Sequence, residues 1–213
     1  LQAIFEHDRA IGGPPPGLRV MGPKAGRLAV VGVVGGFVDG ARLGAALSAH
    51  KNDLMLKDIV KLTDIFWIGG TKAGALFGEA IVIGNEALAA DFSFHIKQRG
   101  ALLAKGRLLG IQFLELFKTS LFFDLTKHAN EMAQKLSVGI VDAGYRLSAK
   151  TETNQIFTIL PNAVIEHLKK YFDFYVWEKF DAEHSVIRLV TSWATDRIQV
   201  DEFLRRVTPR NQS

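Results

Sequence analysis

At Phe37-Val38-Asp39-Gly40-Ala41-Arg42-Leu43-Gly44 an apolar run gives way to an acid, a glycine and an arginine. The run begins upstream, and residues 29–38 are rich in valine and glycine; such an apolar, β-branched run is typical of a strand buried on both faces of a parallel sheet. Asp39 follows the carboxyl end of this strand. Ligands of open α/β sheets bind outside the carboxyl ends of strands, so Asp39 stands where a ligand site is expected.

A second apolar run ends in a lysine. Asp64-Ile65-Phe66-Trp67-Ile68 leads into Gly69-Gly70-Thr71-Lys72. Glycines let the backbone turn sharply, and Lys72 would then project into the same crevice as Asp39. Such a pair suits pyridoxal phosphate, because a lysine amine forms a Schiff base with the cofactor aldehyde while a buried carboxylate keeps the pyridine nitrogen protonated. Taken alone, the same residues also fit a solvated turn and a helix N-cap.

Four segments resemble the threonine aldolase and aromatic amino acid β-eliminating lyase family, which has the aspartate aminotransferase-like fold. They are residues 39–43, residues 69–72, Phe77-Gly78-Glu79-Ala80 and Ile187-Arg188-Leu189-Val190-Thr191-Ser192-Trp193. The similarity is nearly continuous from Phe37 to about Phe203, with Ala73 where related sequences often carry asparagine. The resemblance implies an α/β chain that combines the C-terminal part of a pyridoxal phosphate transferase-like large domain with a small α+β C-terminal domain.

The resemblance also implies roles for individual residues. Asp39 would pair with the pyridinium nitrogen, Lys72 would bind the cofactor covalently, and Arg42 and Arg188 would hold the substrate carboxylate. A planar guanidinium suits this task, because it can donate two parallel hydrogen bonds to a carboxylate. For Arg188, an ion pair with an acid on the polar face of a sheet is the alternative. Thr71 is expected either to support the cofactor phosphate or ring, or to satisfy a turn amide.

Two further basic residues, Lys105 and Arg107, fall within a long helix predicted over residues 96–117. By resemblance, basic residues here reach the cofactor phosphate of a neighbouring subunit, and the full-length family form is a homodimer or homotetramer. Gly106 between them costs a helix about 1 kcal/mol relative to alanine, and close packing across an interface would be a reason to keep it. An exposed basic face is the alternative.

The implied activity is that of low-specificity threonine aldolase, which splits a β-hydroxy amino acid such as threonine into glycine and an aldehyde. Loss of the hydroxyl proton would cleave the bond between Cα and Cβ. One alternative is a related lyase that eliminates a β-substituent. The other is an inactive truncated family member.

We expect an N-terminally truncated family member. The family's phosphate loop, ring-stacking group and catalytic histidine belong to the preceding part of the large domain. No histidine of this chain lies in a matching motif, whether His7, His50, His95, His128, His167 or His184. We therefore expect this polypeptide alone to bind cofactor poorly and turn over little. Residues 14–36, rich in glycine and proline, predict an atypical insertion, either a surrogate strand or a surface loop.

Three parts are predicted along the chain: a partial cofactor-binding large domain (1–95), a bridging helix (96–118) and a small C-terminal domain (119–213). Further helices are expected over 2–10, 43–62 (one or two), 123–143, 163–172 and 199–206, and strands over 79–83, 145–147, 155–160, 174–177 and 186–191. The bridging helix would carry an apolar stripe of Leu102, Leu103, Leu109, Phe113 and Leu116. Trp177 and Trp193 are expected as anchors of the core or of a domain interface.

Composition excludes several classes of function. The 26 basic and 22 acidic residues are interspersed, which argues against a nucleic-acid partner despite the net charge of +4. The chain has no cysteine, so disulfides, thiolate metal sites and a cysteine nucleophile are excluded. No window approaches the roughly eighteen apolar residues of a membrane span. We expect a cytoplasmic enzyme that acts on a small amino acid and has no metal or membrane partner.

Overall fold

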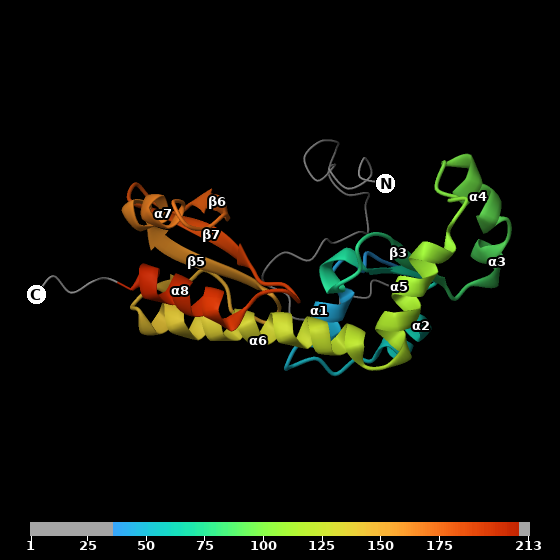
Figure 1. The fold of residues 1–213 in the computed structure, drawn as a ribbon, viewed down its shortest axis with the longest axis horizontal. Helices are drawn as coiled ribbons and strands as arrows, with labels where there is room; N and C mark the ends of the chain where they lie inside the picture. Colours follow the sequence, from blue (N-terminus) through green and yellow to red (C-terminus); the bar gives the residue numbers. More distant parts are fainter. Residues whose placement is uncertain (1–35, 209–213) are drawn as a thin grey trace, which may run out of the picture.

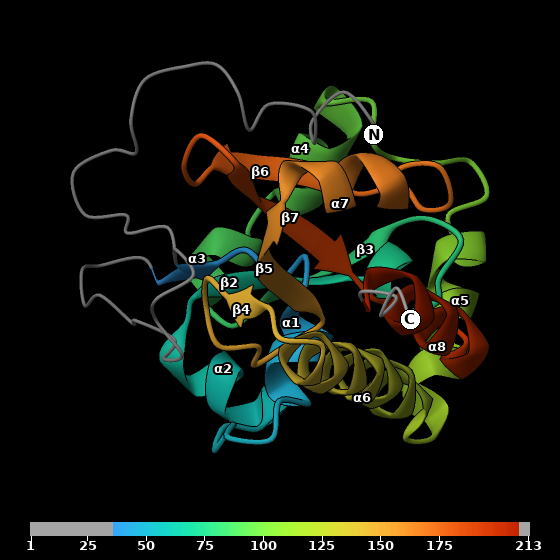
Figure 2. The same cartoon turned by 90° about the vertical axis from the view of Figure 1, so that its left-hand side faces the viewer.

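The computed structural model describes residues 36–208, which form two sheets joined by a long helix (Figures 1 and 2). In the first sheet, β1 (Phe37–Val38) runs parallel to β2 (Ile65–Gly69), and β2 runs antiparallel to β3 (Glu79–Ile83). The second sheet is antiparallel, in the order β4 (Arg146–Leu147), β5 (Gln155–Pro161), β7 (His184–Val190), β6 (Tyr175–Lys179).

The long helix is α6 (Leu121–Asp142), which extends beneath both sheets in Figure 1. The first sheet is accompanied by α1 (Leu43–Leu47), α2 (Leu56–Leu62), the 3-10 helix η2 (Thr71–Ala73), α3 (Glu86–Ala89), α4 (Phe92–Gln98) and α5 (Arg107–Lys118). The second is accompanied by α7 (Asn162–Leu168) and α8 (Arg197–Val207). No helix within residues 36–208 has both the length and the apolarity to cross a membrane.

Helix α6 contributes to two separate hydrophobic cores. Near its start, Phe122 packs into a core with α1, α2, β2 and α5. Further along, Ala133, Leu136 and Ile140 recur at a helical spacing and pack into a core with β5, β7, α7 and α8. The helix ends as predicted, with Gly144 at φ +89° beyond the C-cap Ala143. Helix α6 therefore packs against both sheets and holds them in place relative to each other.

The single helix predicted over residues 96–117 is wrong. α4 ends at Gln98, Gly100 adopts φ +69°, and α5 begins only at Arg107. A residue in the left-handed conformation stops a helix, and glycine adopts that conformation without steric cost. Leu102 and Leu103 consequently lie exposed between the helices, whereas Leu109, Phe113 and Leu116 do face inward. The element that joins the two cores is α6, and the domain limits at residues 95 and 118 stay a prediction.

Two further predictions need correction. β1 is a two-residue edge strand whose Phe37 is 41% exposed, so the doubly buried strand expected over residues 29–38 is wrong for its described end. Trp177 and Trp193 are 49% and 42% exposed, which excludes core positions for both. The helix predicted over 2–10 and the insertion predicted over 14–36 lie, apart from Gly36, outside the described residues. The strand predicted over 79–83 has the predicted ends, the other predicted helices and strands are present with shifted ends, and α7 is shorter than expected.

Candidate functional site

Asp39 follows β1 at the edge of the first sheet where β2 also ends. Its Oδ1 accepts hydrogen bonds from Trp67 Nε1 at 3.0 Å and from the backbone N–H of Ala41 at 2.9 Å. These two donors hold the carboxylate in one orientation. The side chain is exposed, so the expectation of a buried carboxylate is wrong.

Two glycines allow the ends of β1 and β2 to approach each other. A Cβ on Gly40 would lie 1.6 Å from the carbonyl oxygen of Trp67, and one on Gly69 would lie 2.7 Å from that of Ala41. The backbone N–H of Gly69 donates to the Gly40 carbonyl at 3.0 Å across this contact. Only glycine permits such close packing, which places the lysine turn beside Asp39.

Lys72 lies in η2, directly after β2, and its side chain is exposed. The surrounding protein nevertheless removes enough water to lower its pKa below the ordinary lysine value, and desolvation is the largest cause. The positive charges of Arg42 and Arg188 lower this pKa further, while Asp39 and Glu79 oppose the shift. A lowered pKa increases the fraction of neutral amine, which is the nucleophilic form.

Arg42 and Arg188 bring two further cations to Lys72. Burial lowers the pKa of the Arg42 guanidinium, the charge of Arg188 lowers it further, and Asp39 raises it. The Nε atoms of Arg42 and Arg188 are both buried and have no hydrogen-bond partner within residues 36–208. Buried donors of a charged group are costly to leave unpaired, so the pair fits an anionic ligand such as a carboxylate.

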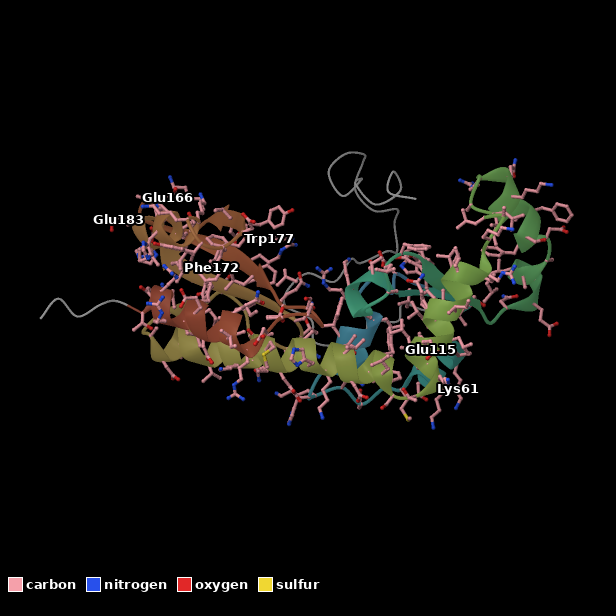
Figure 3. All side chains as sticks on the ribbon, in the orientation of Figure 1. Lys61, Glu115, Glu166, Phe172, Trp177 and Glu183 are labelled. Carbon is pink, nitrogen blue, oxygen red and sulfur yellow. The ribbon has the colours of Figure 1, made fainter. Side chains whose placement is uncertain are left out.

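Arg188 is held by aromatic rings on the second sheet. It lies opposite Phe157 and Tyr175 in the strand register, and its guanidinium lies 5.0 Å from the ring centroids of Tyr175 and Trp177. Figure 3 labels Trp177, which is on β6, the strand that Figures 1 and 2 place farthest from α6. No ion pair to Arg188 occurs in the described part of the chain, so the alternative of a structural ion pair has no partner there.

Glu79 joins this cluster at the first residue of β3. Burial raises its pKa above the ordinary glutamate value, Asp39 raises it further, and Lys72 opposes the shift. Sequence analysis placed Glu79 within a family motif but gave it no role. Its proximity to Lys72 follows from the antiparallel pairing of Gly69 with Glu79 across the turn that carries Lys72.

A pocket opens where the first core, α6 and the second sheet meet. Its lining residues are Ala41, Arg42, Gly44, Ala45, Gly69, Lys72, Ala73, Thr126, Ala129 and Asn154. Asn154 was not predicted, because an asparagine before a strand is typical of an ordinary turn. Thr71, Lys105 and Arg107 are exposed and do not line the pocket. Lys105 lies before α5 and Arg107 is its first residue, so only Arg107 is helical.

Residues 36–208 contain no cluster of three or more histidine and acidic side chains that could hold a metal ion. None of the described histidines lines the pocket. The pocket therefore offers an amine of lowered pKa, Lys72, and one guanidinium with an unpaired Nε atom, Arg42. The charges of Arg188, Asp39 and Glu79 act on Lys72 from outside this lining.

No protein-family model matches the chain. Low specificity L-threonine aldolase of Pseudomonas aeruginosa is 33% identical over 175 residues, which cover 80% of this chain and 49% of the relative. The enzyme of the same name from a Pseudomonas species is 33% identical over 142 residues, covering 66% and 40%. The solved structure of Leishmania major threonine aldolase is 49% identical with a TM-score of 0.78, covering 80% of this chain and 50% of that one. The chain belongs to the threonine aldolase family.

This threonine aldolase family member spans about half the length of the curated relatives it matches, or less. Serine palmitoyltransferase of Sphingomonas wittichii is 14% identical with a TM-score of 0.50, over 70% of this chain and 39% of that one. This likeness concerns the fold alone. The fold class predicted from the sequence, that of the pyridoxal phosphate transferase-like proteins, is confirmed.

Proposed function

We propose that this chain carries the lysine-bearing part of a pyridoxal phosphate-dependent lyase that cleaves a β-hydroxy amino acid such as threonine into glycine and an aldehyde. One observation carries the proposal: Lys72, an amine of lowered pKa, is grouped with two arginines whose buried Nε atoms are unpaired within residues 36–208. Such a site offers a nucleophile for an aldehyde and donors for a carboxylate. The names of the relatives support the same reaction.

The described residues fit pyridoxal phosphate. Asp39 would face the pyridine nitrogen with its carboxylate held by Trp67 Nε1, and Lys72 would bind the aldehyde carbon. When bound, the cofactor supplies an electron sink for negative charge that develops at the substrate Cα. Three cations surround the site against two acids, so a net positive charge is left to complement an anionic ligand.

The chain's own residues orient the substrate. Arg42 and Arg188 would bind the substrate carboxylate, each through a planar guanidinium, and thereby select which bond to Cα is positioned to break. The lowered pKa of Lys72 increases the fraction of its amine that is neutral at a given pH, and only the neutral amine can accept a proton. The aromatic rings of Tyr175 and Trp177 would limit the positions that Arg188 can adopt.

We also propose that Thr71 contacts the cofactor phosphate or ring, and that Lys105 and Arg107 reach the phosphate of a neighbouring copy in a homodimer or homotetramer. Lys105 and Arg107 are exposed. Near them α5 presents Leu108, Ile111 and Leu114, all more than half exposed, on one face. Sedimentation of the purified chain tests the assembly, and a monomer at all concentrations would contradict it.

The cofactor proposal is tested by adding pyridoxal phosphate to the purified chain, recording its visible absorbance before and after borohydride, and mapping the reduced peptide. We expect the adduct on Lys72. Lys72→Ala should abolish it, whereas the control Lys57→Ala, at an exposed position of α2, should not. An adduct spread over surface lysines and unchanged in Lys72→Ala would contradict the assignment.

The reaction is tested by comparing aldehyde release from threonine with pyruvate release from serine. We expect slow aldehyde release that depends on Lys72. Pyruvate as the sole product would favour the β-eliminating lyase instead. Robust aldehyde release that persists in Lys72→Ala would exclude the proposed mechanism.

A further inference from the structure

Asn154 lies just before β5 and is only 5% exposed. Its Nδ2 donates to the carbonyl oxygen of Thr191 at 2.7 Å, and the N–H of Thr191 donates back to the Asn154 carbonyl at 3.0 Å. Thr191 is itself tied to α6, because its Oγ1 donates to the Ala129 carbonyl at 2.6 Å. The Asn154 side chain is therefore held rigidly between the second sheet and α6.

This anchoring decides which amide atom of Asn154 is left without a partner. A carbonyl oxygen can only accept a hydrogen bond, so the amide nitrogen of Asn154 must face Thr191. Its Oδ1, an acceptor, is left buried without a hydrogen-bond partner in residues 36–208. Buried polar atoms are almost always satisfied, and an unsatisfied one calls for a partner that joins it in another state.

The complementary atom belongs to the same pocket. Arg42 and Asn154 both line it, and Arg42 Nε is a buried donor that has no acceptor in the described part of the chain. One residue lacks an acceptor and the other lacks a donor. Hydrogen bonds to charged groups are stronger than those between neutral groups, so their pairing would be favourable.

We propose that Asn154 is a positioning residue for Arg42: its Oδ1 accepts a hydrogen bond from the Arg42 guanidinium when that side chain engages a ligand carboxylate. This inference rests on the proposed function for the nature of the ligand. An amide suits the role better than an acid, because it orients the guanidinium without neutralising it. An aspartate here would compete with the ligand carboxylate for the same cation.

Asn130 provides a matched control. It is 6% exposed, its Nδ2 donates to the Ala45 carbonyl at 2.8 Å, and its Oδ1 is likewise buried and unpaired within residues 36–208. It does not line the pocket. Changes at Asn130 and Asn154 should therefore cost similar stability, whereas only changes at Asn154 should affect Arg42.

The experiment follows the Nε–Hε resonance of Arg42 by NMR in the ¹⁵N-labelled full chain, assigned with Arg42→Lys, during titration with glycine. In the wild type, glycine should shift this resonance and slow its exchange with water. Asn154→Asp should shift it without glycine and weaken glycine binding roughly tenfold or more. Asn154→Ala should leave the free resonance in place, but weaken glycine binding by about tenfold and speed the exchange in the bound state.

Asn130→Asp and Asn130→Ala should match the wild type in the position of the Arg42 resonance and in the affinity for glycine. Asn130→Ala and Asn154→Ala should lower Tm by similar amounts. An Arg42 resonance that ignores glycine in the wild type, or that responds equally to changes at Asn130 and Asn154, would overturn the proposal. Where Asn154→Asp does not fold, the comparison of Asn154→Ala with Asn130→Ala decides it.

The two proposals fail in different ways. A Lys72 adduct with an Arg42 resonance insensitive to Asn154 would refute the positioning role and leave the proposed function intact. An Arg42 resonance that depends on Asn154, in a chain that forms no Lys72 adduct, would refute the proposed function and leave the positioning role of Asn154 intact.

Discussion

At the scale of single residues, the site depends on opposing charges placed around one amine. Desolvation lowers the pKa of Lys72 most, Arg42 and Arg188 add to that effect, and Asp39 and Glu79 counteract it. The charge of each neighbour therefore predicts whether that neighbour raises or lowers the pKa of Lys72.

Removing a neighbouring charge should move the pKa of Lys72 in a direction set by its sign. Arg42→Met should raise this pKa toward the ordinary lysine value, because one repelling cation is lost. Asp39→Asn should lower it further, because an attracting anion is lost. NMR titration of ¹³C-methylated lysine side chains measures both. Shifts of the same direction in the two variants would show that charge is not the cause.

The close approach of β1 and β2 makes a second prediction at this scale. Gly40→Ala would place a Cβ 1.6 Å from the backbone oxygen of Trp67, which a rigid strand cannot relieve. We expect a loss of roughly 2–4 kcal/mol in the free energy of unfolding. Gly110→Ala is the control: no atom lies within 4 Å of that Cβ, and alanine favours the helix α5 by up to about 1 kcal/mol. Urea unfolding of both variants measures the difference, and equal stabilities would contradict the packing argument.

At the scale of elements, α8 shows how local signals stabilise a helix on the second core. Asp196 caps its start by accepting from the Ile198 N–H at 2.8 Å, and Gln199 completes the capping box. Towards its end, Glu202 accepts hydrogen bonds from Arg205 and Arg206, and the Arg206 guanidinium lies 3.5 Å from the ring centroid of Tyr171. The two pairs of Glu202 with Arg205 and Arg206 have the i,i+3 and i,i+4 spacing of neighbours on a helix surface.

Glu202 predicts a dependence of stability on pH. The two arginines hold its pKa at about 2 in the folded state, below the ordinary value of 4.5. The folded chain therefore binds the proton less readily than the unfolded one. The stability that this pair contributes is present above pH 4.5 and is lost as the pH falls toward 2.

Glu202→Gln should remove that dependence. Thermal melts at pH 7 and near pH 3 should show a smaller loss of Tm in this variant than in the wild type. Glu183→Gln is a suitable control, because Glu183 is exposed and belongs to none of the ion pairs found in residues 36–208 (Figure 3). If Glu183→Gln reduces the pH dependence equally, the Glu202 pair is not its source.

At the scale of the whole molecule, the site exists because α6 aligns two cores that are otherwise separate. Arg42 and Lys72 lie at the N-cap of α1 and in η2, beside the first core. Asn154 and Arg188 lie just before β5 and in β7, beside the second core. Thr126 and Ala129 of α6 line the pocket between them. A shift of α6 would therefore alter the site without touching any of its charged residues.

This arrangement predicts that the two cores unfold together. Phe122→Ala in the first core and Ile140→Ala in the second should each cost about 2–5 kcal/mol, since both side chains are almost fully buried. The fluorescence of Trp67, in the first sheet, and that of Trp177, in the second, should change at the same urea concentration in both variants. Single-tryptophan versions of the chain measure this, and two separate midpoints would show that α6 does not couple the cores.

Much of the secondary structure could be predicted because its signals are local. The end of α6 at Gly144, the strand Glu79–Ile83 and the lysine turn after β2 follow from glycine placement and apolar periodicity within a few residues. The break at Gly100 was missed because Ile96 before it and Leu103 after it continue a helical spacing through it. The motif residues Asp39, Arg42, Lys72 and Arg188 were also predicted as a group, although their roles stay predictions.

Tertiary structure alone decided which side chains are buried and which polar atoms have hydrogen-bond partners. The exposure of Asp39, the electrostatic effect of Glu79 on Lys72 and the unpaired atoms of Arg42 and Asn154 all depend on how the folded chain packs around these residues. Local pattern specifies which backbone conformation a residue prefers, because that preference is set by its neighbours in the chain. Desolvation, charge and hydrogen-bond satisfaction are set by whatever packs against the residue in space, and around the pocket this includes Thr126 and Ala129 of α6.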